Sequence, residues 1–549
     1  MSPDQLTGGP PRRRLAHRLP KSLRQHWKLL VVFVAFVTVM ATVFGATRIR
    51  PQITGDSAII ASEITENITG TVDLFDSSVT HEVSLDITDA EYQDMIATFQ
   101  KSGDKKWVTA DIVIDGTFVN DVSIRLKGNS TLMGVRGEDA MPGGKDFQPP
   151  AGMELPEGME RPEGMPSGGP MAGLGISVSV DDPTSLPLLI SFDENVSGRA
   201  YQGLTELSVR PGAPVLNEAM ALSLTEQTDQ PTQRYAYTVY SINDSATSTR
   251  LLLEHPDDSY ANSLFESDGY LYKADANSRL EYTGDDQSDY ADQFKQINAV
   301  DSGNLQPIIN FLKWMDSADE AEFDAHLSDW VDVESFARYV ATQNLLANGD
   351  DMSGPGQNYY LWYDLDTEKI TVVSWDLNLA MQGSATAGPH DTISMMGPVG
   401  MGVTAAPGGA ATETAGPGGP PPAGDAGAPA GDAGAPAGPG RQQGGDRAPQ
   451  GAGPGGDGAP GGGMGSRGGN ALKSRFLESE GFAAMYEATY WELAEQIYDS
   501  GLASELLDRL AETVPVSDGL SAKTLKSKVA EMRTWIDQRT TALTDLRAD

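Results

Sequence analysis

Apolar and polar residues alternate along 108–131, VTADIVIDGTFVNDVSIRLKGNST, with Asp115-Gly116 between two runs. Alternation with a period of two predicts half-buried strands, and an Asp-Gly pair between two such runs predicts a β-hairpin. Further strand-like runs follow at 186–192, 204–209, 235–242 and 250–254. The first half of the folded chain is therefore predicted to be rich in β-strands.

Helical spacing of apolar residues occurs first at 215–224 and dominates later in the chain. Asp332 can cap a helix, and the C-terminal stretch 471–547 is helical in pattern throughout. Between them, 358–364 and 369–374 are predicted to form another hairpin. Strands with one helix, followed mostly by helices, favour an α+β body in two lobes.

Two stretches are of low complexity and are predicted not to fold, because they cannot bury enough apolar surface to offset the entropy of ordering. Residues 133–172 combine Gly, Pro and Glu with methionines at a regular spacing of six, and 384–470 are mostly Gly, Pro and Ala. The methionine thioethers could bind a soft cation such as Cu(I). Low-complexity drift is the simpler interpretation. The methionines in question are Met153, Met159, Met165 and Met171.

An apolar run without charges, LLVVFVAFVTVMATVFGA, occupies residues 29–46. As a helix it would be about 27 Å long, close to the thickness of the bilayer core. Seven basic residues and one acidic residue precede it in 1–28, so the positive-inside rule places that segment in the cytoplasm and the body outside the cell membrane. A cleaved signal peptide is the alternative, since Gly45 and Ala46 are small.

The formal net charge is −38, and the chain after residue 28 holds 32 basic and 76 acidic residues. Nucleic acid is an unsuitable partner for so acidic a surface, because its affinity comes mostly from Lys and Arg at phosphates. Cysteine is absent, which excludes disulfides, thiolate metal sites and thiol nucleophiles. The six histidines are scattered without metal-ligand spacing.

These patterns predict a division of the chain into five parts. They are a basic cytoplasmic tail (1–28), a single-pass transmembrane anchor (29–46), a tether (47–70), a β-rich N-lobe-like part (71–265, insert 133–172) and a mainly helical C-lobe-like part (266–549, insert 384–470).

The segment 344–383 carries most of the candidate chemistry. A predicted helix ends at Asn348, a loop carries Asp350 and Asp351, and the following hairpin begins at Asn358 and delivers Asp376 after its second strand. Carboxylate and amide oxygens are the ligands that Mg²⁺ prefers, and phosphoryl transfer needs a carboxylate near the acceptor hydroxyl. Ordinary acidic loop residues are the alternative interpretation.

The segment resembles the signature of the CotH (spore coat protein H) kinase family, in which an N-x-D loop precedes an N-Y-Y-L strand and a W-D-x-[DN] element. Other hallmarks of that family have counterparts here in the same order. They are RLKGNS at 125–130, FDENVSGRAYQGLTELSV at 192–209, NEAMALSL at 217–224, the run from RLLLEH to GYLYK at 250–273, and LKSRFLESEGF at 472–482. The resemblance covers about 71–383 and 471–549.

The resemblance implies a bilobal atypical protein-kinase-like fold and a role for each matching residue. Asp350 would be the catalytic aspartate, with Asp351 as the alternative, while Asn358 and Asp376 would hold the metal. The remaining implied roles concern the nucleotide: a phosphate-covering turn at Gly128, Asn129 and Ser130, phosphate neutralisation by Arg125 or Lys127, orientation of such a cation by Glu218, and a weaker candidate, Lys273.

The implied cofactors are ATP and Mg²⁺ or Mn²⁺, and the implied reaction is transfer of the γ-phosphate to Ser or Thr of surface or secreted proteins. Those protein substrates and the membrane are the expected partners. The other hypotheses are a non-catalytic surface assembly or adhesion protein (a pseudokinase) and an export-side copper-binding protein that uses the methionine series.

Overall fold

A computed structural model of the chain describes residues 64–128, 130–135, 178–276, 278–300, 303–393 and 470–548. Within these ranges no helix combines the length and apolar character that a membrane span requires. The predicted cytoplasmic tail and anchor lie outside the described residues, as do nearly all of the two predicted inserts.

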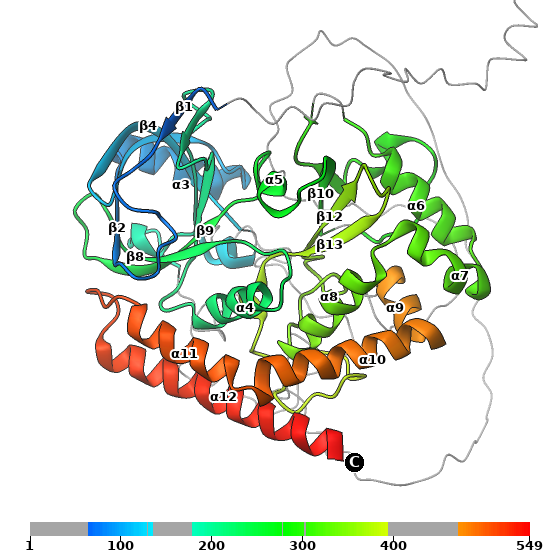
Figure 1. Cartoon of the computed structure of the whole chain (residues 1–549). Helices are drawn as coiled ribbons and strands as arrows, with labels where there is room; N and C mark the ends of the chain where they lie inside the picture. The colour runs from blue at the N-terminus through cyan, green and yellow to red at the C-terminus, as the bar shows by residue number, and fades with distance from the viewer. Residues whose placement is uncertain are drawn as a thin grey trace, which may run out of the picture. The chain divides into compact units, whose positions relative to one another are not determined.

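Seven strands close into a barrel in the order β2-β3-β4-β5-β7-β9-β8 (Figure 1). The predicted hairpin of 108–131 is confirmed, because β3 and β4 pair antiparallel through the Asp115-Gly116 turn. Closure comes from β2 and β8, which pair parallel. The strands are β2 (His81–Asp86), β3 (Val108–Ile114), β4 (Thr117–Leu126), β5 (Leu188–Ser191), β7 (Glu206–Val209), β8 (Tyr235–Ile242) and β9 (Ser248–Glu254).

Apolar side chains from every barrel strand form one core, into which α3 (Asp89–Ser102) inserts Met95, Ile96 and Phe99. A short pair, β1 (Glu66–Ile68) with β6 (Arg199–Tyr201), adds to this part of the chain. The core accounts for the period-two pattern of the sequence, since alternate strand residues face inward.

Helix α4 (Leu216–Gln227) belongs to a second, larger core, and most of its side chains are buried. Burial of this extent means that other elements enclose the helix on most sides, with the polar side chain of Glu218 among those enclosed. This core also holds one face of a four-stranded sheet, ordered β11-β10-β12-β13. These strands are β10 (Gly269–Ala274), β11 (Phe294–Gln296), β12 (Tyr359–Asp364) and β13 (Ile370–Ser374), so the predicted second hairpin is confirmed.

Helices surround this sheet and continue to the C-terminus. The predicted cap at Asp332 is confirmed, because the Asp332 carboxylate accepts a hydrogen bond from Ser335 N at 3.1 Å. The helices are α5 (Tyr260–Leu264), α6 (Gln306–Ser317), α7 (Glu320–Trp330), α8 (Val333–Leu345), α9 (Ala471–Glu478), α10 (Glu480–Ala494), α11 (Leu502–Thr513) and α12 (Ala522–Ala548), with a π-helical turn at Glu495–Asp499.

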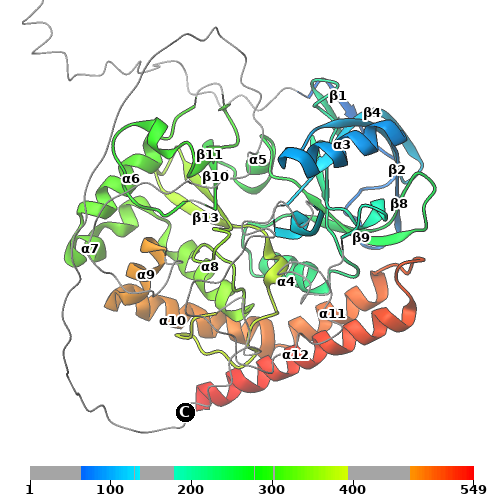
Figure 2. The same ribbon diagram turned by 180° about the vertical axis from the view of Figure 1, so that it is seen from behind.

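Helices α11 and α12 pack side by side along both the barrel and the sheet-containing part (Figures 1 and 2). The turn between them binds the barrel, because Asp518 accepts hydrogen bonds from Thr247 and Pro515 O accepts one from Thr249. Most strands precede most helices along the chain and nearly all strand pairs are antiparallel, so the prediction of an α+β fold is confirmed.

Candidate functional site

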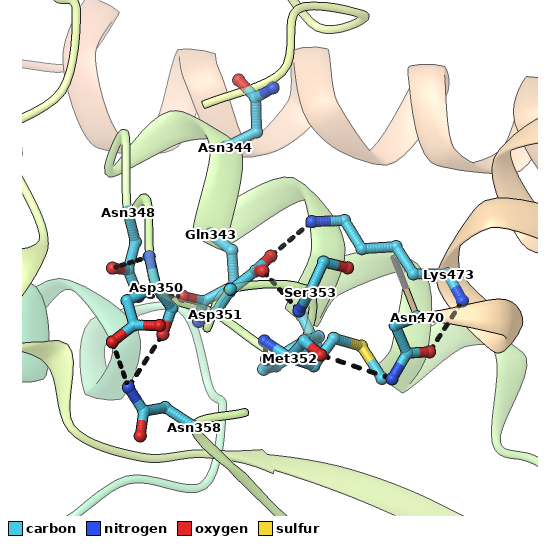
Figure 3. Close-up of polar contacts among 12 residues, drawn as sticks. Gln343, Asn344, Asn348, Asp350, Asp351, Met352, Ser353, Asn358, Asn470 and Lys473 are labelled. Carbon is cyan, nitrogen blue, oxygen red and sulfur yellow. Dashed lines mark hydrogen bonds and ion pairs between the residues drawn. The ribbon is translucent and has the colours of Figure 1, made fainter. Parts of the chain in front are cut away.

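The loop after α8 brings Asp350 and Asn358 together (Figure 3). Asn358 Nδ2 donates to both the backbone oxygen and Oδ2 of Asp350, each at 3.0 Å, and Gly356 N donates to Oδ1 at 2.7 Å. Glycine is needed at 354 and 356, since a Cβ at Gly354 would lie 2.4 Å from Asp350 Cα and one at Gly356 would lie 2.7 Å from its Oδ2. The loop therefore fixes both oxygens of the Asp350 carboxylate.

A relay of side-chain hydrogen bonds connects this loop to the end of β13. Asp350 N donates to Asn348 Oδ1 at 3.2 Å, and Asn348 Nδ2 donates to Gln343 Oε1 at 2.8 Å. Gln343 Nε2 in turn donates to Ser374 Oγ at 3.1 Å, two residues before Asp376. The relay is buried, so its polar groups strongly favour this single arrangement.

The pKa of Asp350 is raised to about 6, chiefly because its carboxyl group is partly buried. Hydrogen bonds from Gly356 and Asn358 lower the pKa, whereas the negative charges of Asp376 and Asp351 raise it. Asp376 lies near this loop because β12 and β13 pair Tyr359 with Ser374, which puts Asn358 and Asp376 at the same end of the hairpin.

Asp351 has a different environment from its neighbour. Its side chain is only 6% exposed and forms an ion pair with Lys473 of α9. Its Oδ1 also accepts a hydrogen bond from Ser353 N at 2.8 Å. Because both oxygens are engaged by groups within the protein, Asp351 is unsuited to accept a proton from a substrate, and Asp350 is the better catalytic candidate of the two.

Asp376 follows Trp375 at the end of β13 and has a left-handed backbone, with φ of 54°. One carboxylate oxygen accepts a hydrogen bond from Arg210, which follows β7. The same guanidinium binds Glu218 of α4, with Nε 2.9 Å from Oε1. Burial raises the pKa of Glu218, and the Arg210 charge opposes that rise.

The expected partner of Glu218 therefore needs correction: its bound cation is Arg210, not Arg125 or Lys127. Sequence reasoning did not single out Arg210. Arg210 could have been found from the sequence, because it directly follows the strand-like run LTELSV. A charged residue at the end of a buried strand requires a partner of opposite charge.

The metal expected from the sequence can be tested against Asn358 and Asp376. Asn358 uses its amide nitrogen on Asp350, and no hydrogen bond to its amide oxygen is found within the described ranges. Asp376 uses one oxygen on Arg210 and is 28% exposed. An amide oxygen and a carboxylate oxygen suit Mg²⁺, which takes its other ligands from water and phosphate. Among the described residues, this site included, no group of three or more His, Asp or Glu side chains is placed to hold a metal, so water and phosphate would have to supply most of the ligands.

Lys127 and Lys273 approach the same aromatic ring. Their ammonium groups lie 5.1 and 5.6 Å from the centre of Trp375, a cation–π geometry. Lys127 also donates to Ser208 and lies 3.1 Å from His255 Nδ1. Burial lowers the pKa of Lys127 well below its usual value, and the charges of Arg210 and Lys273 lower it further.

The other nucleotide candidates lie at the end of β4 or outside the described residues. Arg125 stacks over Trp107 at 4.8 Å and interacts electrostatically with Glu206, whose pKa burial raises to about 7. Gly128 has φ of +96°, and Ser130 begins a 3₁₀ turn (Ser130–Val135). Asn129 lies outside the described residues. The turn conformation thus requires glycine at 128, where a Cβ would lie 2.5 Å from Thr131 Oγ1.

Comparison with known proteins gives one family match. The model of the CotH kinase protein family matches residues 211–408, a range that includes α4, the Asp350 loop and Asp376. No curated protein matches the chain. The resemblance inferred from the sequence motifs is therefore confirmed for this stretch, in which the chain is similar to the CotH kinase family.

Proposed function

We propose that this chain is a membrane-anchored, extracytoplasmic CotH-like atypical protein kinase with a bilobal kinase-like fold. It transfers the γ-phosphate of ATP to Ser or Thr of surface or secreted proteins. The family match supports kinase chemistry in general. The observation that carries the proposal is that Asp350 and Asn358 are hydrogen-bonded in the loop after α8, and that the β12–β13 hairpin brings Asp376 to the end where Asn358 lies.

In this proposal each residue has a role that its contacts favour. Asp350, held by Asn358 and Gly356, orients the acceptor hydroxyl and accepts its proton. Asn358 and Asp376 hold the divalent cation, which when bound neutralises charge on the nucleotide phosphates. Arg210 orients Asp376, and Lys127 binds phosphate, with Arg125 and Lys273 nearby in the same field of positive charge.

The phosphate-binding role of these lysines is favoured by charge distribution. The chain as a whole has a formal net charge of −38. His255, however, lies among several cations. Burial lowers the pKa of its imidazole well below the usual value, and the charges of four nearby cations lower it further. These cations are Lys127, Lys273, Arg125 and Lys295. Glu206 lies in the same place, 3.4 Å from His255 Nε2, and a cluster of cations of this kind within an acidic protein is suited to bind a polyphosphate.

The binding step can be measured by calorimetric titration of ATP into the full-length protein in detergent. Binding is expected to require Mg²⁺ or Mn²⁺ and to be lost in Asp376→Ala. If Asp376→Ala binds ATP as tightly as the wild type, Asp376 is not a metal ligand. If ATP does not bind with either metal, the kinase proposal fails and the non-catalytic surface-protein hypothesis replaces it.

The membrane topology can be tested with thiols, because the natural chain contains no cysteine. Val516 is 54% exposed, so Val516→Cys introduces a single accessible thiol in the body. In intact cells an impermeant maleimide should label Val516→Cys but not the matched control Ser2→Cys. Labelling of Ser2→Cys alone would show the reverse orientation, and release of the body into the medium would favour a cleaved signal peptide.

A further inference from the structure

Helix α9 is bound to the loop that carries Asp350 (Figure 3). Asn470 caps the helix, since its Oδ1 accepts a hydrogen bond from Lys473 N at 3.2 Å, and its Nδ2 donates to Met352 O at 3.4 Å. One turn further on, the Lys473 ammonium pairs with Asp351. Asn470 therefore contacts the backbone of this loop and Lys473 contacts one of its side chains, although they lie 118 and 122 positions further along the chain than their partners.

The Lys473–Asp351 pair is more enclosed than an ordinary surface ion pair. The exposed fractions are 21% for Lys473 and 6% for Asp351. A carboxylate buried to this extent requires a counter-charge, and removing one partner leaves the other uncompensated. Lys473 is the cation that forms an ion pair with Asp351 within the described ranges. By contrast, Lys528 and Glu531 on α12 form a pair in which both side chains are at least half exposed.

Asp351 also connects Asp350, at the start of the loop, with Asn358, at its end. Its backbone oxygen accepts hydrogen bonds from Gly354 N at 3.0 Å and from Asn358 N at 3.3 Å. It is adjacent to Asp350 in sequence, and Asn358 is the residue that binds the Asp350 carboxylate. A movement of Asp351 therefore changes the separation between Asp350 and Asn358.

From these contacts we infer that Lys473 is a positioning residue for phosphoryl transfer, which by neutralising Asp351 holds Asp350 and Asn358 in their relative places. The predicted effect on the rate rests on the proposed kinase function. The predicted effect of Lys473 on the conformation of the loop does not depend on that function. It implies that the segment beginning at Asn470 completes the site built by 344–376.

The test compares Lys473→Met, Lys473→Arg and Asp351→Asn/Lys473→Met in the full-length protein, with Lys528→Met as the matched control. Lys473→Met should lower kcat by about 10- to 100-fold, as expected for a small misplacement of a catalytic group, while KM for ATP changes by less than about threefold. Lys473→Arg should retain most of the activity. The double variant should regain part of the lost kcat, because it contains no uncompensated carboxylate. Lys528→Met should match the wild type.

Hydrogen–deuterium exchange of the loop amides gives a second readout that needs no activity. Exchange at Ser353 N–H and Gly356 N–H should be faster in Lys473→Met than in the wild type or Lys528→Met. If the wild type transfers no phosphate, the kinase proposal fails, and faster exchange would still establish the hold of Lys473 on the loop. Unchanged exchange together with unchanged kcat per folded molecule in Lys473→Met would overturn the inference. If Lys473→Met does not fold, wild-type kcat together with wild-type loop exchange in the double variant, which lacks the ion pair, would overturn it.

Discussion

The guanidinium of Arg210 donates a hydrogen bond to the carboxylate of Asp376, 166 positions further along the chain. The same group binds Glu218 of α4, so one cation joins the end of β7, a buried helix and the residue after β13. Because Arg210 binds one carboxylate oxygen of Asp376, the orientation of the other carboxylate oxygen is fixed as well. Orientation of this proposed metal ligand depends on a residue outside the CotH-matched range, since that range begins at 211.

Replacing Arg210 by lysine should weaken metal binding. Lysine keeps the charge but cannot bridge two carboxylates with a planar fork. Loss of an outer partner of a metal ligand typically costs about 10- to 100-fold in affinity, and Arg210→Lys should lose Mn²⁺ affinity in that range by electron paramagnetic resonance titration. Arg533→Lys, at an exposed pair with Asp508, is the control. Equal Mn²⁺ affinity in the two variants would argue against an orienting role.

Activity should fall at acidic pH because Asp350 must be ionised to accept a proton. Its pKa is raised to about 6, so it takes up a proton at a higher pH than an ordinary aspartate. The pH profile of kcat/KM reports the groups of the free enzyme. It should decline as the pH falls through about 6. Glu206 has a pKa of about 7, so Glu206→Gln is the control, and a limb that disappears in this variant would assign the titration to Glu206.

Two glycine substitutions should have opposite effects on stability. Gly354→Ala places a Cβ 2.4 Å from Asp350 Cα, so the loop must shift and both activity and unfolding temperature should fall. Gly481 is the second residue of α10, and an added Cβ there would meet no atom of the described residues outside its own turn within 4 Å, so Gly481→Ala should stabilise by about 0.4–1 kcal/mol. Chemical denaturation measures the free energy of unfolding of each variant, and a thermal melt and a transfer assay measure the other two effects in Gly354→Ala. A neutral Gly354→Ala would show that the loop geometry is not required.

Lys127→Met should impair nucleotide binding more than folding. The ammonium group is held among other cations, and its pKa is lowered by burial and by Arg210 and Lys273. Removing it relieves that repulsion and loses a hydrogen bond to Ser208, a net cost of no more than about 1 kcal/mol. KM for ATP should rise at least tenfold if Lys127 contacts phosphate, a loss of about 1.4 kcal/mol. Unchanged KM with a large loss of stability would make Lys127 a structural residue.

Local patterns were sufficient to predict much of the fold. The alternation of 108–131 predicted β3 and β4, and the acidic cap at Asp332 predicted the start of α8. Closure of the barrel could not be predicted in this way. It depends on the parallel pairing of β2 with β8, whose partners His81 and Thr238 are far apart in sequence, and nothing local specifies such a register.

The candidate site was predictable where its residues are close in sequence. Asp350 and Asn358 stand within one loop, and the hairpin that follows carries Asp376 beside them. Arg210 and Lys473 were not predicted, because each reaches the site from a distant element and a single cation has no local signature. The contrast between Asp350 and Asp351 likewise required the tertiary partner Lys473.

The central claim is tested most directly by phosphate transfer. The full-length protein in detergent is incubated with γ-labelled ATP and Mg²⁺ or Mn²⁺, beside Asp376→Ala and Asp350→Asn. Metal-dependent label on the protein or on an added Ser-rich acceptor, stable as phosphoserine or phosphothreonine and absent from both variants, is the predicted result. Absence of transfer from a wild type that binds metal and ATP, or equal transfer by the wild type and both variants, would contradict the assignment of this site as a kinase centre.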